Sequence, residues 1–375
     1  MGMEKLNDRK FCKTIGISIM NNKPRVLAIY LPQYHPIKEN DQWWGTGYTE
    51  WVAVAAAKPL YQGHEQPIIP GELGFYDLRF SLIQEQQAAL AKQYGIEGFV
   101  YWHYWLGDGK RLLEKPAELM LHNPKVDIPF CFAWANHSWK GVFFGAKGHT
   151  LVQQLYNGID DYRQHFEAVL PYFRDKRYIR VNGKPLFGIF NPAEIPSCKD
   201  FTEYWNSWAK EEGLGGITFY GELYGDTTEQ YGLDFSTFSR HRVIEHIDSK
   251  AGTVRYLERL RHHIPCRIKA YPYKDAMPYF LKDTLRDNEW PSIITGWDTT
   301  ARLGKEAVVL YDRTPELFRE HVKQVLTQIK DRSQETNIVF IKSWNEWAEG
   351  NYLEPDRKWG RAYLEVLKNE LDLFL

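Results

Sequence analysis

The sequence predicts one α/β domain folded as a (β/α)8 TIM barrel, and three observations support this fold class. Eight short apolar runs are spread along the 375 residues, helical stretches separate most of them, and nearly all end in polar or aromatic residues. Short and nearly continuous apolar runs are typical of strands buried on both faces, as in parallel sheets. Strands that alternate with helices favour a parallel barrel or an open doubly wound sheet. Because no GxGxxG motif follows the first run, the open sheet has less support.

The predicted strands are the eight apolar runs, in which Val, Ile, Phe, Tyr and Trp are frequent. They are residues 25–31 (RVLAIYL), 97–105 (EGFVYWHYW), 128–136 (IPFCFAWAN), 184–191 (KPLFGIFN), 215–222 (GGITFYGE), 233–240 (LDFSTFSR), 290–298 (WPSIITGWD) and 337–346 (NIVFIKSWNE). The clearest helix is predicted for residues 315–330, where apolar residues recur on one stripe. Thr314 is placed as its N-cap and Pro315 as its first residue. We expect residues 25–375 to form the catalytic domain, after a poorly ordered extension over residues 1–24.

The composition indicates a carbohydrate ligand rather than a nucleic acid. The net charge of −1 gives no sign of a nucleic-acid or acidic-membrane partner. Aromatic residues make up 15 % of the chain, and most of them must pack in the core. Others stand beside polar residues in residues 41–51 (DQWWGTGYTEW) and 101–108 (YWHYWLGD). A ring can cover the C–H face of a sugar while polar neighbours bind its hydroxyls, so we expect an oligo- or polysaccharide substrate.

Neither a metal nor a cofactor is expected. The cysteines Cys12, Cys131, Cys198 and Cys266 form no CxxC pair, which argues against a zinc cluster or a disulfide framework. No cluster of His, Asp and Glu shows ligand spacing. No run is long and apolar enough to span a membrane, and residues 1–20 lack the apolar stretch of a secretory signal. We therefore expect a cytoplasmic protein with no membrane span.

The residues that end the predicted strands are the candidates for a site, because barrels place their sites at the C-terminal ends of strands. In chain order they are Gln33, Tyr34 and His35; Trp102 and His103; Trp134, Asn136 and His137; Asn191; Tyr220 and Glu222; Arg240 and His241; Trp297 and Asp298; Asn345, Glu346 and Glu349. The first loop, which holds Trp43, Trp44, Tyr48, Glu50 and Trp51, forms either one wall of the cleft or a satellite hydrophobic cluster. For His103 a core position is the alternative, and for Asp298 a loop cap.

From these candidates we predict a set of substrate-binding residues. They are Tyr34, His35, Trp43, Trp44, Trp102, His103, Trp134, Asn136, His137, Tyr220, Glu222, Trp297, Asp298, Asn345 and Trp347.

The segment SWNEWAEG, residues 343–350, places Glu346 and Glu349 three residues apart after the last predicted strand. Residues three apart in a helical turn share one face, with Cβ atoms about 5–6 Å apart. This spacing is compatible with the carboxyl separation of about 5–5.5 Å in retaining glycosidases. So close a pair repels when both are ionised, which raises one pKa and prepares a general acid. The alternative is two solvated glutamates at the start of the last helix, where negative charge is favoured.

Longer segments around these residues resemble a known family. Residues 343–355 (SWNEWAEGNYLEP) resemble the C-terminal signature of the WbsX-type proteins, which are similar to glycoside hydrolase family 99, the endo-α-mannosidases. Residues 29–51 (IYLPQYHPIKENDQWWGTGYTEW) resemble the N-terminal signature, and residues 132–139 (FAWANHSW) and 296–302 (GWDTTAR) resemble internal blocks. The resemblance covers about residues 26–367. It implies a (β/α)8 barrel that acts on glycans without metal.

The resemblance also implies catalytic roles for the two glutamates. Glu346 corresponds to the residue that deprotonates the sugar 2-hydroxyl and so gives a 1,2-anhydro intermediate. Glu349 corresponds to the general acid that protonates the leaving oxygen and then activates water. Ala348 stands where the hydrolases have His, so mannosidase specificity is not implied. Departures from the WbsX pattern at His137 and Ser138, and at Thr299 and Ala301, indicate an altered substrate.

Three functions are open at this point. The first is a retaining endo-glycosidase that acts on a bacterial surface polysaccharide. The second is a glycosyltransferase of O-antigen or capsule biosynthesis, favoured by the absence of a visible signal but lacking a DxD motif or a Gly-rich phosphate loop. The third is a carbohydrate-binding barrel without catalysis, which gains little from holding two acids together.

Overall fold

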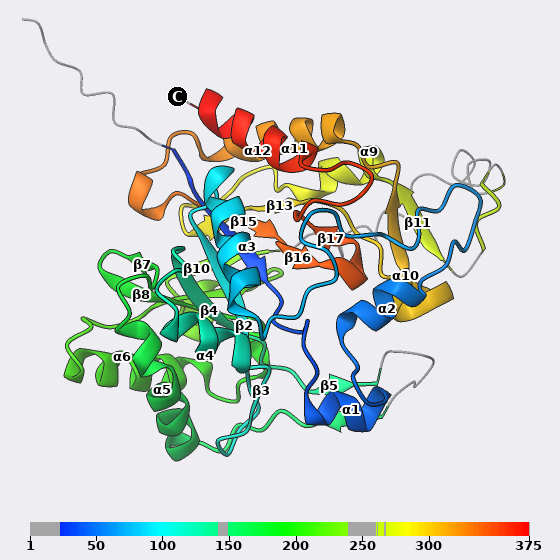
Figure 1. Ribbon diagram of the computed structural model, residues 1–375. Helices are drawn as coiled ribbons and strands as arrows, with labels where there is room; N and C mark the ends of the chain where they lie inside the picture. Colours follow the sequence, from blue (N-terminus) through cyan, green and yellow to red (C-terminus); the bar gives the residue numbers. More distant parts are fainter. Residues whose placement is uncertain (1–22, 142–148, 239–259, 261, 266–267, 375) are drawn as a thin grey trace, which may run out of the picture.

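The computed structural model is a closed barrel of parallel strands surrounded by helices (Figure 1). It describes residues 23–141, 149–238, 260, 262–265 and 268–374. The barrel strands are β1 (Arg25–Tyr30), β2 (Gly98–Trp105), β4 (Phe130–Trp134), β8 (Lys184–Ile189), β9 (Thr218–Glu222), β10 (Phe235–Thr237), the pair β12 (Glu289–Trp290) and β13 (Ser292–Ile294), and β15 (Ile338–Lys342). Each lies within or overlaps one predicted apolar run, and the predicted (β/α)8 fold class is confirmed.

The barrel closes through the seventh strand. From β1 to β10 each barrel strand pairs in parallel with the next one along the chain. Strand β10 then pairs with β12, β13 pairs with β15, and β15 pairs with β1. Only Pro291 separates β12 from β13, and its lack of an N–H interrupts the hydrogen bonds of a continuous strand. Its carbonyl still accepts a hydrogen bond of 3.0 Å from the Phe340 N–H, which holds the interruption against β15.

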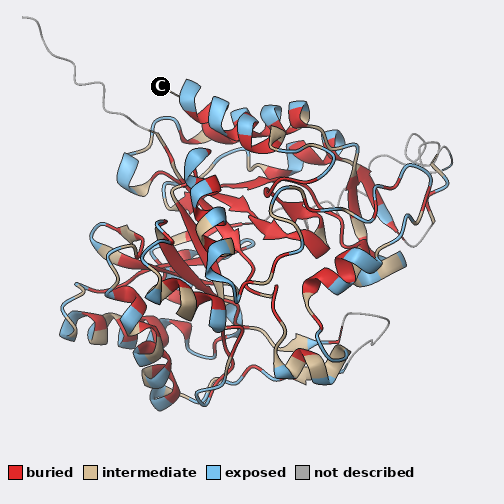
Figure 2. Ribbon diagram, viewed as in Figure 1, coloured by how far each residue is buried: buried red, intermediate tan, exposed pale blue. Residues whose placement is uncertain are grey.

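The longer helices cover the outside of the barrel, and the short helices α2 (Glu50–Ala56) and α10 (Thr300–Leu303) lie at its mouth against the loop after β15. The others are α1 (Lys38–Trp44), α3 (Ser81–Gln93), α4 (Lys115–His122), α5 (Ile159–Phe173), α6 (Cys198–Glu211), α7 (Thr228–Tyr231), α9 (Tyr273–Ala276), α11 (Pro315–Ile329) and α12 (Ala362–Leu373). Helix α11 begins as predicted, because the Thr314 side chain accepts a hydrogen bond from the Leu317 N–H and Pro315 is the first helical residue. Figure 2 shows that the helices keep an exposed outer face while the strands are buried.

Short strands lie outside the ring, and some of them shape the mouth. They are β3 (Arg111–Leu112), β5 (Trp139–Lys140), β6 (Thr150–Val152), β7 (Arg180–Val181), β11 (Lys269–Pro272), β14 (Val308–Tyr311), β16 (Asn345–Glu346) and β17 (Asn351–Tyr352). Strands β16 and β17 form an antiparallel pair directly after the last barrel strand. This pair carries Glu346, so the loop after β15 is itself structured.

The barrel interior is packed by aromatic side chains from facing strands. The Tyr220 ring on β9 lies 5.0 Å from the Phe340 ring on β15. It also lies against Gly188 on β8, where an added Cβ would approach the Tyr220 ring and hydroxyl to 2.5 Å. Glycine at this position is therefore required by the close approach of the tyrosine. The interior is a packed core rather than an open channel.

Several predictions fall wholly or partly outside the described residues. The predicted N-terminal extension does so except for residues 23 and 24, and so do Arg240 and His241 at the end of the sixth run. Cys131 and Cys198 are buried and form no disulfide. Within the described ranges, no helix has the length and apolar character needed to cross a membrane.

Candidate active site

The loop after β15 places Glu346 and Glu349 at the C-terminal mouth of the barrel. Glu346 ends β16, and Glu349 ends the 3-10 turn η6 (Trp347–Glu349). Gly350 then reverses the chain with φ of 58°, a left-handed conformation that favours glycine. An added Cβ at Gly350 would also lie 2.7 Å from the Cβ of Asp298. The local geometry of this loop therefore depends on a glycine directly after the second glutamate.

One guanidinium joins the two carboxylates. Arg302 in α10 donates from one terminal nitrogen to Glu349 and from the other to Glu346, at 3.2 Å from Oε2. The same guanidinium donates to Glu50 at the start of α2, at 3.2 Å from Nε and 3.1 Å from the second terminal nitrogen. Three carboxylates from two separate loops therefore surround a single cation from a third loop, and Glu346 and Glu349 share a partner.

Burial controls the protonation of this cluster. Burial, together with the charge of Glu349, raises the pKa of Glu346 to about 8, and the opposing effect of Arg302 is smaller. Burial also raises the pKa of Glu50, again against the effect of Arg302. Burial alone would lower the pKa of Arg302, but its three carboxylate neighbours hold it well above the ordinary value. At neutral pH the guanidinium is charged and the pair of Glu346 and Glu349 retains a proton.

Asp298 holds the backbone of Glu349. Its N–H donates to the Glu349 carbonyl at 2.6 Å. One carboxylate oxygen lies 2.9 Å from His64 Nε2 and accepts from Gln66 at 2.8 Å, while the other accepts from the Thr300 N–H and hydroxyl at 2.9 and 2.6 Å. With these partners the carboxylate holds the first residue of α10 and fixes the loop. These are the contacts of a loop cap, the alternative named for Asp298 from sequence.

Tyr34 and Asn345 hold the backbone on either side of Glu346. The Tyr34 hydroxyl donates to the Asn345 carbonyl at 2.5 Å and accepts from the Trp347 N–H at 3.1 Å. The Asn345 side chain accepts from the Leu31 N–H at 2.7 Å and donates to its carbonyl at 3.1 Å. Both predicted residues therefore lie at the site, but their polar groups position the loop between β15 and β17.

Trp347 lies in the core beneath the loop. Its ring stacks on Tyr352 with centroids 3.9 Å apart, and its Nε1 donates to Glu354 at 2.7 Å. Burial raises the pKa of Glu354 to about 7, although hydrogen bonds from Gln87 and Trp347 oppose this. Ala348, between the two glutamates in the turn, is buried as well. The turn thus has an apolar underside that anchors it and a charged side that meets Arg302.

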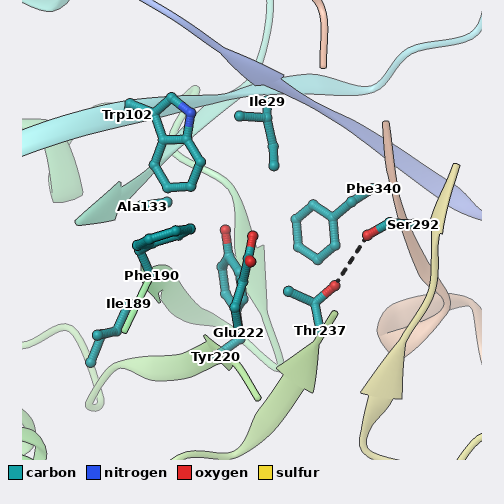
Figure 3. Close-up of a pocket in the computed structure, with 10 residues that line it drawn as sticks. All are labelled: Ile29, Trp102, Ala133, Ile189, Phe190, Tyr220, Glu222, Thr237, Ser292 and Phe340. Carbon is teal, nitrogen blue, oxygen red and sulfur yellow. Dashed lines mark hydrogen bonds between the residues drawn. The ribbon is translucent and has the colours of Figure 1, made fainter. Parts of the chain in front are cut away.

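A pocket lies inside the mouth of the barrel (Figure 3). Every barrel strand contributes at least one lining residue, and Phe190, directly after β8, also lines it. Its lining residues are Ile29, Trp102, Ala133, Ile189, Phe190, Tyr220, Glu222, Thr237, Ser292 and Phe340. Trp102 and Phe190 meet edge to face with centroids 5.5 Å apart. Glu222 accepts from Lys342 at 3.1 Å through one oxygen and from the Tyr224 hydroxyl at 3.1 Å through the other. The predicted residues Trp102, Tyr220 and Glu222 are brought together here.

Other predicted residues lie away from this pocket. His103 points out of the barrel toward α5, with its Nε2 2.9 Å from His165 Nε2. Trp134 also faces α5 and α6, and its Nε1 donates to the Trp105 carbonyl at 2.8 Å. His35 is buried, and burial lowers its pKa to about 4. These three side chains belong to the packing around the barrel, and for His103 this is the core position named as the alternative.

The remaining predicted residues lie on the rim and beside it. Asn136 donates to the Asn191 carbonyl and accepts from its N–H, both at 2.7 Å, which ties together the loops after β4 and β8. The His137 ring lies 5.3 Å from Phe190. The other three rings lie further along the rim, where Trp43 packs on Trp139, Trp44 packs on Tyr48, and Trp297 lines a second hollow with Tyr61, His64 and Tyr311.

Two charged residues of the site, Arg302 and Lys342, are absent from the candidates predicted from sequence, and Glu50 was predicted only as part of the first loop. Glu50 and Arg302 stand inside two of the blocks that carry the resemblance, and Lys342 interrupts an otherwise apolar run. A charged residue inside an apolar run or inside a motif block was the signal in the sequence that could have identified these residues as part of the site. Among the residues with described positions, no group of three His, Cys, Asp or Glu side chains could hold a metal ion.

Comparison with solved structures shows the same fold in glycoside hydrolases. The GH99 endo-alpha-mannosidase from Bacteroides thetaiotaomicron, solved in complex with BIS-TRIS-Propane, aligns with a TM-score of 0.56 at 15 % identity. The alignment covers 93 % of this chain and 97 % of that one. A glycoside hydrolase-like protein aligns with a TM-score of 0.57 at 13 % identity, over 93 % and 94 % of the two chains. At these identities the likeness shows a common barrel fold.

Comparison of sequences identifies the family. A protein from Xanthomonas campestris pv. campestris described as uncharacterized protein WxcX is 31 % identical over 361 residues. The match covers 92 % of this chain and 49 % of the relative, so the chain spans about half the length of that relative. Residues 26–367 match the family described as glycosyltransferase WbsX. The resemblance predicted from the two terminal signatures is thereby confirmed, and the chain belongs to the WbsX family.

Proposed function

We propose that this chain is a retaining glycoside hydrolase that cleaves a bond within a bacterial surface polysaccharide. The observation that carries the proposal is the pair of Glu346 and Glu349, two carboxylates bound to one guanidinium at the mouth of a barrel. General acid and base catalysis of glycoside cleavage requires two carboxyl groups held close together with one proton. The glycoside hydrolases that share the fold support this reaction class.

In the first step Glu346 takes the proton of the sugar 2-hydroxyl, and the 2-oxygen forms a bond to C1. The bond between C1 and the leaving oxygen breaks, and Glu349 gives that oxygen its proton. In the second step Glu349 takes a proton from water, whose oxygen attacks C1. The bond between C1 and the 2-oxygen opens, and Glu346 returns its proton there. Two inversions at C1 retain the configuration, and the intermediate is a 1,2-anhydro sugar.

The proton count of the pair suits this sequence of steps. The raised pKa of Glu346 indicates that its carboxyl keeps a proton at pH 7. The first step needs a proton on the pair, with Glu346 ionised and Glu349 protonated. Binding of the sugar therefore has to move a proton within the pair, without loss to solvent. Arg302 contacts both carboxylates and stabilises whichever is ionised.

Glu50 is a positioning residue in this proposal. It is 1 % exposed and binds the Nε side of Arg302. A guanidinium presents its donors in a rigid planar fork, so a carboxylate on one edge fixes the direction of the others. Glu50 thus aims Arg302 at the two catalytic glutamates. The first loop of the barrel contributes to the chemistry through this contact.

A glycosyltransferase of O-antigen or capsule biosynthesis, and so of lipopolysaccharide biosynthesis, is the second candidate. The description of the family, glycosyltransferase WbsX, favours it. Such an enzyme would work in the cytoplasm, where nucleotide-sugar donors are found. The sequence contains neither a DxD motif nor a Gly-rich phosphate loop to bind the donor diphosphate. A carbohydrate-binding barrel without catalysis is disfavoured because a buried Glu346 stands beside a half-buried Glu349, which binding alone does not require.

The deciding experiment is product analysis by mass spectrometry in H₂¹⁸O with a panel of bacterial surface polysaccharides. The wild-type chain should release oligosaccharides that carry the label at the new reducing end. Glu349→Gln should release about 10²- to 10⁴-fold less, since it removes the general acid and base. Glu203→Gln, at an exposed position of α6, is the matched control and should behave as wild type.

Absence of labelled sugar across a panel that contains the native glycan would exclude hydrolysis. Release of nucleotide from a sugar-nucleotide donor in the same preparation would then establish the transferase. Binding of glycan that Glu349→Gln leaves unchanged, with neither labelled product nor released nucleotide, would instead indicate a lectin.

A further inference from the structure

A second charged pair crosses the mouth beside the glutamates. Lys342 is the last residue of β15, and Glu222 is the last residue of β9, three strands away around the barrel. Their side chains meet with Nζ 3.1 Å from Oε1, and the side chains are only 9 % and 5 % exposed. Two strands that do not pair with each other therefore send opposite charges into the same part of the barrel opening.

The pair rests on aromatic rings. Lys342 Nζ lies 5.3 Å from the centroid of the Trp102 ring and 5.9 Å from that of Phe190. In Figure 3 the Glu222 side chain lies in the middle of the pocket, between Phe190 on one side and Phe340 on the other. The second oxygen of Glu222 accepts from Tyr224, which is 57 % exposed. Lys342 and Glu222 thus lie between the apolar rings of the pocket and the solvent-exposed Tyr224.

Stability gives little reason for this arrangement. Removing a lysine and a glutamate from water is expensive, and a buried ion pair often contributes no more than apolar side chains of the same volume. An ammonium group offers three donors, and an ionised carboxylate offers about four acceptor positions. In the contact between the two, Lys342 Nζ donates to one oxygen of Glu222, and the other oxygen accepts from the Tyr224 hydroxyl. A donor and an acceptor fixed side by side over an aromatic ring are what a sugar hydroxyl requires.

The pair also lies close to the proposed chemistry. Lys342 precedes Glu346 by four residues, and its charge reaches Glu346, where it lowers the pKa against the larger effect of burial. Trp102 on β2 and Glu222 on β9 belong to the same pocket. A sugar ring placed for attack at Glu346 therefore has Lys342 as its neighbour on the inner side of the mouth.

We propose that Lys342 and Glu222 determine specificity by holding one hydroxyl of the sugar ring that reacts at Glu346. Lys342 donates to the hydroxyl oxygen, Glu222 accepts the hydroxyl proton, and Trp102 with Phe190 faces the C–H surface. The inference rests on the proposed function in that it places the reacting sugar at Glu346. It adds that the reacting sugar carries a free hydroxyl toward the pair.

The test combines a variant of the pair with deoxy sugars. The probes are methyl α- and β-glycosides of mannose, glucose, galactose and N-acetylglucosamine, with binding to the purified chain measured by saturation-transfer NMR and titration. The best-binding glycoside is then compared with its monodeoxy analogues on wild type and on Lys342→Met. Lys368→Met, at an exposed position of α12, is the matched control. Binding is measured rather than turnover, so the result does not depend on hydrolysis.

We expect Lys342→Met to weaken binding of the parent glycoside about 10- to 100-fold, as for loss of a hydrogen bond to a charged group. One monodeoxy analogue should bind the wild type and Lys342→Met equally, because the lost hydroxyl and the lost ammonium act as a unit. The double variant Lys342→Met/Glu222→Gln, which leaves no buried charge of the pair without its partner, should show the same pattern if Lys342→Met folds poorly.

Equal weakening of the parent and every deoxy analogue, or no weakening at all, would overturn the inference. So would failure of every glycoside to bind the wild-type chain. Binding that follows the expected pattern without any labelled product from the polysaccharides would overturn the proposed hydrolase while leaving the specificity pair standing.

Discussion

Glu346 lies between a second carboxylate and a guanidinium, and its protonation is the balance of these neighbours against burial. Glu349 and Glu50 both disfavour its ionised form, as burial does, while Arg302 and Lys342 favour it. Burial is the largest of these effects, so the carboxyl keeps its proton to a pH well above the ordinary range of glutamate. A buried glutamic acid without an ionisable neighbour would keep this proton and could not act as a base. Glu349, three residues away, can take the proton from Glu346.

We expect kcat/KM to fall as the pH rises above about 8. Below this pH the pair holds the proton that Glu349 needs as an acid; above it that proton is lost, and the rate should fall about tenfold per pH unit. The measurement is the pH profile of kcat/KM with the polysaccharide that the wild type cleaves. Glu50→Gln should shift this limb to lower pH, because the negative charge of Glu50 raises the pKa of Glu346. A flat profile between pH 7 and 9 would contradict the protonation argument.

The loop from β16 to β17 is the element on which the site depends. Tyr34 binds it on both sides of Glu346, Asp298 binds it at Glu349, and Trp347 anchors its underside. Tyr34 and Asp298 come from two other parts of the chain, Trp347 belongs to the loop itself, and together these contacts leave the turn little freedom. Catalytic groups are effective when the backbone that carries them is held in this way.

Gly350→Ala should disturb this element twice. A left-handed φ disfavours alanine by about 1–2 kcal/mol, and the clash with Asp298 should add about 1–3 kcal/mol to the loss in unfolding free energy. Gly360→Ala is the matched control, since its φ of 54° is similar and an added Cβ meets nothing within 4 Å. Urea unfolding and kcat should both be affected more at Gly350. Equal effects at the two glycines would contradict the proposed role of the Asp298 contact.

The sequence predicts the strands well but not which face of each strand meets the mouth. In β2 both faces are buried, so the apolar pattern carries no alternation to show that Trp102 points inward and His103 outward. The same reason explains why Trp134 was a candidate and lies against α5 and α6. Glu346 and Glu349 were accessible to prediction because a short motif contains both. The guanidinium that joins them comes from a different loop, and no spacing in the sequence links Arg302 to Glu50, 252 residues away.

The whole molecule behaves as one packed ring, since every barrel strand contributes to the pocket in the mouth. Packing inside the ring should therefore affect residues far from the catalytic loop. Tyr220 shows this most directly, because it fills the space that Gly188 leaves and touches the floor of the pocket. Side chains inside a barrel form the layers of one packed core. A larger side chain in one layer therefore displaces the side chains that pack against it.

Gly188→Ala should lower the free energy of unfolding by about 1–3 kcal/mol through overpacking against Tyr220. Tyr220→Leu should remove the clash, so the double variant should be more stable than the sum of the two single effects predicts. Urea unfolding of the four proteins gives the coupling free energy. Additive effects would show that Gly188 and Tyr220 do not compete for space.

The pairing of β1 with β15 has a consequence for synthesis. One edge of β1 binds β2 early, but its other partner begins at Ile338, about 300 residues later. At about 5–20 residues per second, that edge stays unpaired on the ribosome for about 15–60 seconds. An unpaired apolar strand edge is a template for association with other chains. We therefore expect nascent chains to need a chaperone until the last barrel strand emerges, and truncation before β15 to give aggregates.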